Sequence, residues 1–207
     1  MKEPSPAAAD DVNARIARRV REFRTLRAET LESLAAKCGV SRSMISLIER
    51  AEASPTAAVL EKLAAGLGVS MASLFGPEEA QQAPHPLARR SDQAIWKDPE
   101  SGYLRRNLSP PRWPSPLQLV EVHFPAGARV AYDAGVRRQA QEQQVWVLQG
   151  QIDITHGPQR HRLHGGDCLA LRLDQPLVYS NPGPRSARYL VAICDEVLAH
   201  LLKGTTT

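Results

Sequence analysis

Apolar residues in the first third of the chain recur at spacings of three and four. In residues 11–27 these positions are Val12, Ile16, Val20 and Phe23. Side chains at these spacings share one face of an α-helix, so the pattern predicts an amphipathic helix. Hydroxyl-bearing residues, which can cap the first turn of a helix, precede four further predicted helices. They lie at Thr30, Ser41, Ser54–Thr56 and Ser70.

The second and third predicted helices are joined by the tight turn Gly39-Val40-Ser41. Glycine readily adopts the positive φ that ends a helix, and the serine caps the helix that follows. Ile45 and Ile48 of the third helix are expected to face inward. Its outward residues are then Arg42, Ser43 and Ser46. Two short helices joined in this way and braced by their neighbours are a helix-turn-helix.

From Trp96 onward the chain changes to short apolar runs separated by glycine and proline turns. The predicted strands are residues 117–124, 143–148, 151–155, 168–173, 177–180 and 188–193. Many short strands at close intervals are typical of a β-sandwich or barrel. Residues 195–203 are predicted to form a final helix.

The same change predicts two domains. Residues 11–76 are expected to form an all-α domain of five helices, and residues 93–203 an all-β domain. Between them, residues 77–92 are polar and contain prolines, which is typical of a linker.

Composition narrows the class of protein. Hydrophobic residues make up 43% of the 207 and charged residues 23%, which favours a globular chain over a disordered one. No apolar run approaches the roughly 18 residues of a membrane span, and the polar first residues do not resemble a secretory signal. Three widely spaced cysteines without a CxxC pair argue against a disulfide scaffold or zinc finger. A reducing, cytoplasmic location is therefore expected.

The formal net charge is only +4, from 26 basic and 22 acidic residues. The distribution is less even, because residues 15–27 hold six arginines against one acid, Glu22. A basic cluster suits phosphate binding, although general arginine usage explains it equally well.

Residues 15–75 resemble the XRE-type, or phage-repressor, DNA-binding domain. The resemblance is carried by VREFRTLRAETLESLAAKCGVSRSMISLIERAEASPTAAVLEKLAAGLGVSMASLF, which follows the family pattern without an insertion. It implies a five-helix bundle whose third helix enters the major groove of double-stranded DNA. The DNA-binding residues that it implies are Thr30, Ser41, Arg42, Ser43, Ser46 and Arg50.

The same resemblance implies separate roles within this domain. Arg42 would contact guanine, and Thr30 would help to hold a phosphate at the amino end of the second helix. Arg24 and Glu49 match a structural salt bridge between the first and third helices. Ala28-Glu29 is a departure from the pattern, because relatives often carry a glycine before the second helix. Met44, like its neighbour Leu47, is assigned to packing as readily as to contact with a thymine methyl group.

The second half resembles a cupin, a jelly-roll β-barrel, over roughly residues 117–191. Two stretches carry the likeness: QQVWVLQGQIDI, at residues 143–154, and GGDCLALRLDQPLVYSN, at residues 165–181. Gly150 anchors the first motif, and Gly166 and Asn181 anchor the second. The resemblance implies a barrel that continues from a DNA-binding domain in the manner of bacterial regulators.

Metal-binding cupins use two or three histidines and a glutamate, and those positions are replaced here. The glutamate position is Gln143 and the last histidine position is Leu177. The paired histidines would fall on Arg137 and Gln139, or on Val136 and Arg138. We therefore expect no metal and no other cofactor. The remaining candidates, His156, His161 and His164, are expected to be solvated surface residues.

A barrel without a metal can still enclose an effector pocket. The residues expected to line it are Tyr132, Arg137, Gln143, Val145, Val147, Leu177 and Tyr179. Apolar walls with a few polar groups suit a small ligand, although the same residues can simply fill the core. Cys168 and Cys194 lie in apolar runs and are assigned to packing rather than to redox chemistry.

Three functions follow from the two resemblances. The first is a non-enzymatic transcriptional regulator that binds an inverted repeat in DNA as a homodimer and senses a small-molecule effector. The second is a metal-dependent cupin enzyme, a dioxygenase or isomerase, whose helix-turn-helix controls its own operon. The third is a phage-type or antitoxin-like repressor in which the barrel only joins two copies. The replacement of the metal-ligand residues favours the first function over the second.

Overall fold

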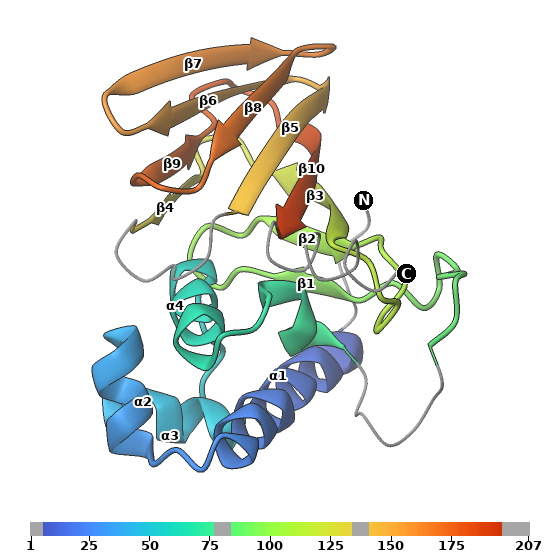
Figure 1. Ribbon diagram of the computed structural model, residues 1–207. Helices are drawn as coiled ribbons and strands as arrows, with labels where there is room; N and C mark the ends of the chain where they lie inside the picture. Colours follow the sequence, from blue (N-terminus) through green and yellow to red (C-terminus); the bar gives the residue numbers. More distant parts are fainter. Residues whose placement is uncertain (1–5, 77–83, 134–140, 196–207) are drawn as a thin grey trace, which may run out of the picture.

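The computed structural model describes residues 6–76, 84–133 and 141–195. In this part of the chain the first half is helical, and its helices lie together below the sheets in Figure 1. The elements are α1 (Pro6–Leu26), α2 (Leu31–Cys38), α3 (Arg42–Glu49), α4 (Ala57–Leu67) and the 3-10 helix η1 (Met71–Phe75). The fifth predicted helix is thus a 3-10 helix, because only five residues separate Ser70 from Gly76.

The predicted helix boundaries are confirmed where a local signal sets them. Thr30 and Ser41 each accept a hydrogen bond from the backbone N–H three residues further on. Gly39 ends α2 with a φ of +66°, in the left-handed region. The first helix begins at Pro6, earlier than predicted, because proline is tolerated in the first turn of a helix.

The apolar stripe of α1 packs into the core as its spacing predicts. Each of its four residues is at most 7% exposed: Val12, Ile16, Val20 and Phe23. Ile45 and Ile48 hold α3 in the same core. Helices α2 and α4 approach so closely that a Cβ at Gly66 would lie 2.7 Å from the Cβ of Cys38. Only glycine fits there, and α4 is therefore fixed against α2.

The second half contains two antiparallel sheets in the described residues. The first has the order β1-β2-β3-β10-β5-β8 and the second β4-β9-β6-β7. The strands are β1 (Ile95–Lys97), β2 (Leu104–Asn107), β3 (Leu117–Phe124), β4 (Arg129–Tyr132), β5 (Gln141–Gln149), β6 (Gln151–His156), β7 (Gln159–His164), β8 (Cys168–Arg172), β9 (Leu177–Ser180) and β10 (Ala187–Asp195). The six predicted strands are all present.

The two sheets pack face to face over an apolar core. Tyr179 of β9 stacks on Tyr189 of β10, with the two rings 6.0 Å apart and nearly parallel. The side-chain amide of Gln143 on β5 also crosses between the sheets and donates to the hydroxyl of Tyr179 at 2.5 Å. Sequence analysis missed β1, β2, β4 and β7, because they are short or lack alternating apolar residues.

The anchors of the second resemblance have structural roles. Gly150 joins β5 to β6 with a φ of +81°, and a Cβ there would lie 2.9 Å from the carbonyl oxygen of Ser186. Asn181 is 1% exposed, and its amide donates to the backbone carbonyls of Phe124, Pro125 and Arg185. Glycine and asparagine at these positions therefore fix the turns between strands.

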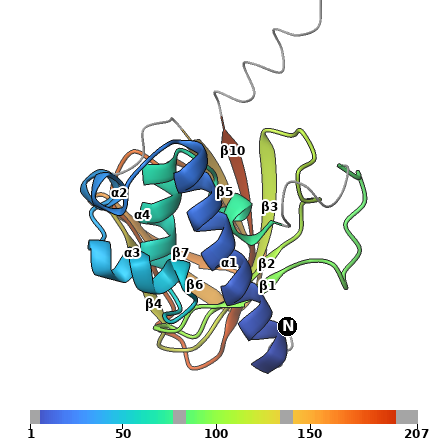
Figure 2. The same cartoon turned by 90° about the horizontal axis from the view of Figure 1, so that it is seen from below.

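The helical half and the sheets share one continuous core. The ring of Phe75 in η1 lies 5.9 Å from the ring of Trp96 in β1. The buried carboxylate of Asp98 accepts a hydrogen bond from the backbone N–H of Ala57 at the start of α4, at 2.8 Å. Figures 1 and 2 show α1 and α4 against the strands, in agreement with contacts of α1 with β1 and of α4 with β4.

Two other predictions have different outcomes. Of the predicted final helix, only Asp195 lies within the described residues, and it ends strand β10. Cys168 is exposed, so its assignment to core packing is wrong; β8 is an edge strand and this residue lies on its outer face. Among the described residues, the helices are too short or too polar to span a membrane.

Candidate nucleic-acid interface and adjoining cavity

Helix α3 presents a polar surface on the outside of the helical half. Ser41, Arg42, Ser43 and Met44 are exposed, while Ser46 and Leu47 are half-buried. Exposed Arg50 follows directly after the helix. Arg42 and Ser43 thus face outward as expected, Ser46 is only partly exposed, and Met44 is 38% exposed rather than packed.

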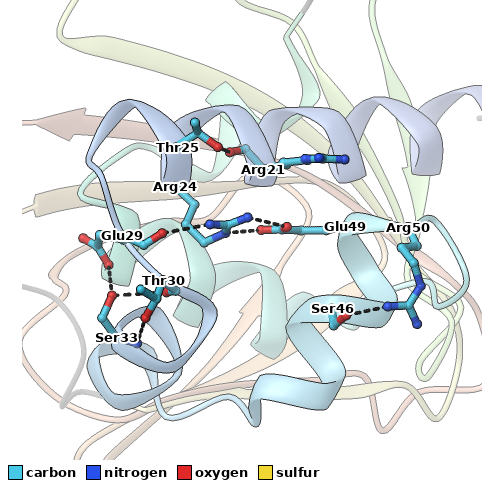
Figure 3. A network of polar contacts seen from close by, with 9 residues as sticks. All are labelled: Arg21, Arg24, Thr25, Glu29, Thr30, Ser33, Ser46, Glu49 and Arg50. Carbon is cyan, nitrogen blue, oxygen red and sulfur yellow. Dashed lines mark hydrogen bonds and ion pairs between the residues drawn. The ribbon is translucent and has the colours of Figure 1, made fainter.

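A bidentate ion pair holds α3 against α1 (Figure 3). Arg24 Nε donates to Glu49 Oε1 at 2.6 Å, and Arg24 Nη2 donates to Glu49 Oε2 at 2.9 Å. The third donor, Nη1, reaches the carbonyl oxygen of Glu29 at 2.8 Å. The hydrogen bonds that Arg24 donates to Glu49 raise the pKa of Arg24. One guanidinium thus fixes α3, α1 and the loop between α1 and α2 together.

That loop contains the departure from the family pattern. Ala28 has a φ of +51°, in the left-handed region that favours glycine. The backbone therefore keeps the conformation expected of glycine although alanine occupies the position. Two residues further on, the hydroxyl of Thr30 accepts a hydrogen bond from the backbone N–H of Ser33 at 3.0 Å, and Thr30 therefore caps the exposed amino end of α2.

Both outward arginines are paired with acids that sequence analysis did not single out. Arg42 Nε lies 2.6 Å from Glu32 Oε1, and both side chains are exposed. Arg50 forms two hydrogen bonds with Glu52, at 2.9 and 2.7 Å, and these lower the pKa of Glu52 and raise that of Arg50. Arg50 Nη1 also donates to the Ser46 hydroxyl at 2.5 Å. These exposed pairs bring negative charge next to the candidate DNA-contacting residues.

A cavity of about 230 Å³ lies between α4 and the two sheets. Tyr132, Gln143, Leu177 and Tyr179 line it, as the sequence predicts. Val145 and Val147 are fully buried and do not line it, so at these two positions the alternative of a filled core is correct. Arg137 lies outside the described residues.

Several lining residues were not predicted. Arg105 comes from β2, which the apolar pattern did not identify as a strand, and Tyr103 directly precedes that strand. The other unexpected wall is helical, because Ala64 and Ala65 of α4, with Gly68 at its C-cap, line the cavity from the other side. No local signal marks these residues, because they meet only when the two halves pack.

The cavity's tyrosines form a connected set of rings. Tyr132 and Tyr179 meet edge to face with their ring centres 6.1 Å apart. The hydroxyls of Tyr103 and Tyr132 lie 3.5 Å apart. Burial raises the pKa of Tyr103, Tyr132 and Tyr189, so these phenols stay protonated at neutral pH. They are neutral hydrogen-bonding groups on apolar walls.

The positions that hold a metal in cupins carry other contacts. Gln143 donates to Tyr179, and Leu177 is 1% exposed in the core. His156 ends β6 and its side chain is only 16% exposed, so it is not the solvated surface residue that was expected; its Nε2 lies 3.3 Å from Asp174 Oδ1. His161 and His164 are on β7, where a spacing of three places them on opposite faces. Within the described residues, no three His, Cys, Asp or Glu side chains gather as a metal site.

Comparisons with known proteins agree with this arrangement. Residues 20–74 match the family model for a helix-turn-helix. No curated protein matches the sequence. The crystal structure of an HTH_3 family transcriptional regulator from Vibrio cholerae is similar, with a TM-score of 0.72 and 24% identity. The similarity covers 90% of this chain and 98% of that one, and it therefore extends over both halves.

Two cupins show weaker similarity. The Cupin_2 domain of an XRE family transcriptional regulator from Enterobacter cloacae has a TM-score of 0.41 and 15% identity, covering 44% of this chain and 95% of that one. An RmlC-like cupin from Shewanella frigidimarina has a TM-score of 0.44 and 16% identity, covering 56% and 95%. These scores are too low to add to the fold assignment. Over both halves, the fold of the chain is similar to that of the Vibrio cholerae protein. Residues 20–74 are a helix-turn-helix domain of the HTH_3, or XRE-type, family.

Proposed function

We propose that this protein is a transcriptional regulator that binds a specific sequence in double-stranded DNA. The observation that carries the proposal is the exposed surface of α3, with Arg42 and Ser43 at its amino end. A helix held in this way enters the major groove, where its first residues meet the edges of the bases. A guanidinium reads guanine through two hydrogen bonds to O6 and N7.

The other contacts in this proposal are to the DNA backbone. Thr30 and Ser41 lie at the amino ends of α2 and α3, where backbone N–H groups and a hydroxyl favour phosphate. Ser46 and Arg50 extend the surface along α3. In the free protein Arg42 pairs with Glu32 and Arg50 with Glu52. On DNA each arginine would exchange its carboxylate for a base edge or a phosphate.

In this proposal the β-half is a cupin-type jelly roll that joins two copies and binds an effector. The support is its two facing sheets, its cavity, and the turn-forming roles of Gly150 and Asn181. We assign residues 11–76 to DNA binding, 77–92 to a linker and 93–203 to the cupin. A binding role is favoured over a catalytic one by Gln143 and Leu177 at two metal-ligand positions.

The test is selection of duplexes from a random pool, followed by binding measurements on the best sequence. Arg42→Ala should weaken binding by about 1–3 kcal/mol and relax the preference at one base position. Arg129, an exposed arginine on β4, gives the matched control. Arg129→Ala should leave the affinity and the base preference unchanged. If Arg42→Ala binds the selected sequence as tightly as the unaltered protein, α3 is not the reading helix.

A further inference from the structure

The cavity between α4 and the sheets contains an unusual buried charge. Arg105 of β2 is 7% exposed and lines the cavity. Its Nε donates to the side-chain oxygen of Asn107 at 3.2 Å, and its guanidinium lies 5.9 Å from the ring centre of Phe75. Its Nη2 is buried and has no hydrogen-bond partner among the described residues. Arginine stays charged in proteins, so this group is a buried cation with an unused donor.

The other buried arginines of the described residues each have a carboxylate partner, which Arg105 lacks. Arg19 is 4% exposed and donates to a carboxylate oxygen of Glu22 at 2.7 Å. Arg106, also 4% exposed, lies on the opposite face of β2 with Nε 3.6 Å from Glu121 Oε2. Both are compensated by a carboxylate in the protein. A buried charge without such a partner is strongly unfavourable, and an anionic ligand would supply the carboxylate that the protein does not.

Nearby acids are already engaged. Asp98 is buried and accepts hydrogen bonds from the backbone N–H groups of Ala57 and Ser101. Glu61 lines the cavity from α4 and has an interaction of its own. Neither is hydrogen-bonded to Arg105 in the described part of the chain. The tyrosine hydroxyls around Arg105 are protonated and can donate, so the polar groups here favour a ligand that accepts hydrogen bonds.

We propose that this cavity binds a small organic carboxylate, with its carboxylate on Arg105 and its apolar body against the tyrosine rings. The carboxylate would accept a hydrogen bond from the unused Nη2, and a hydrogen bond between two charged groups is stronger than one between neutral groups. The volume of about 230 Å³ lies below the range of drug-sized pockets, which begins at about 300 Å³. The inference rests on the proposed function, for which it names the chemical class of the effector.

The position of the cavity also connects the ligand to the DNA-binding half. Ala64 and Ala65 of α4 form one wall with Gly68 at its C-cap, and α4 meets α2 at the close contact between Gly66 and Cys38. A ligand that changes the distance between α4 and the sheets therefore acts one helix away from the reading helix. To switch DNA binding, it must bind the competent and incompetent arrangements with different affinity.

The first experiment uses the full chain and paired probes: acetate, hexanoate, benzoate and 3-phenylpropionate, each beside its uncharged amide, with inorganic phosphate as a separate anion. Thermal unfolding and calorimetry should show at least one acid binding about tenfold or more tightly than its amide, because a charge-assisted hydrogen bond is lost in the amide. Equal binding of acids and amides, no binding of any acid, or binding of phosphate alone would overturn the proposal.

Variants separate a ligand site from a structural role. Arg105→Gln should abolish the preference for the acid and leave the free protein as stable or more stable, because it removes an uncompensated charge. Arg106→Gln, on the opposite face of the same strand, should lower stability and keep the preference. If Arg105→Gln lowers the melting temperature as much as Arg106→Gln does, Arg105 is structural. Ala65→Leu narrows the cavity from the side of α4. It should weaken the binding of the acids, and the variant should still fold.

Measuring DNA binding without any added acid separates the proposed regulator function from the proposed carboxylate site. If the selected duplex binds tightly and no acid binds, the regulator assignment stands and the carboxylate site is wrong. If acids bind but no duplex is selected, the site stands and the regulator assignment fails.

Discussion

At the scale of single residues, buried charge divides into paired and unpaired groups. Asp153 is fully buried, and Arg162 and Arg160 both donate to its carboxylate from β7. These hydrogen bonds lower the pKa of Asp153 from 3.8 to about 2. Arg105 is the contrasting case, in which the protein provides a buried cation and no carboxylate. The first arrangement contributes to stability, and for the second we propose that a ligand supplies the carboxylate.

The pKa of Asp153 predicts how stability depends on pH. Because the folded pKa lies below the ordinary value, the contribution is complete above about pH 4 and is lost as the pH falls towards about 2. Asp153→Asn should therefore lower the free energy of unfolding by on the order of 2 kcal/mol near neutral pH. The difference from the unaltered protein should shrink as the solution is acidified. Urea unfolding at a series of pH values measures both effects.

Glu142 provides the control for this measurement. It pairs with Arg172 at 3.0 Å, and both side chains are half or more exposed. Exposed pairs contribute about 0–1 kcal/mol, so Glu142→Gln should have little effect. An Asp153→Asn variant that loses nothing at neutral pH would show that the two arginines do not stabilise the buried carboxylate.

At the scale of elements, local signals predicted the helices and long-range packing decided the rest. Thr30, Ser41 and Gly39 act on backbone groups within four residues, so their roles can be predicted from the sequence. Strand β2, with the sequence LRRN, has no alternating apolar pattern, and it becomes a strand only by pairing with β1 and β3. The part of the cavity formed by β2 and α4 was missed for that reason.

The acidic partners of α3 are a second feature that only the fold reveals. Glu32 lies on α2, and its carboxylate forms an ion pair with Arg42 of α3. This pair places a negative charge beside the proposed DNA-binding surface. Glu32→Gln should tighten binding to the selected duplex by a few-fold at low salt, because it frees Arg42 and removes repulsion from the phosphates. Titrations at several salt concentrations measure the change.

Asp174→Asn serves as the control, because it removes an acid of similar exposure, 62% against 63% for Glu32, from the loop between β8 and β9. It should leave DNA binding unaltered. Weaker binding by Glu32→Gln would show that Glu32 holds Arg42 in the orientation that reads the base.

At the scale of the whole molecule, one outer face of the six-stranded sheet carries several exposed apolar side chains. Trp146 is 48% exposed, Leu117 45% and Leu119 37%, and Trp146 lies beside Leu190 in the register of β5 and β10. One helix-turn-helix makes few contacts with DNA, and such modules commonly act as two-fold dimers. We expect this face to join two copies and so to present two reading helices to an inverted repeat.

Trp146→Lys tests this face by placing a charge in its centre. Light scattering should show a dimer for the unaltered protein and a monomer for the variant, with weaker binding to the selected duplex. Trp113, a tryptophan that is 44% exposed outside the strands, supplies the matched control, and Trp113→Lys should remain dimeric. A Trp146→Lys protein that is still dimeric would exclude this face as the contact between copies.

The packing of Phe75 on Trp96 and of Asp98 on Ala57 limits how this chain can be recombined. Helix-turn-helix units are easily pictured as modules that evolution moves from one protein to another. Here the last turn of the helical half and the first N–H of α4 are both completed by residues near β1. A transplanted unit would therefore have to carry β1 and β2 with it, and the natural point of exchange in this chain lies after residue 107.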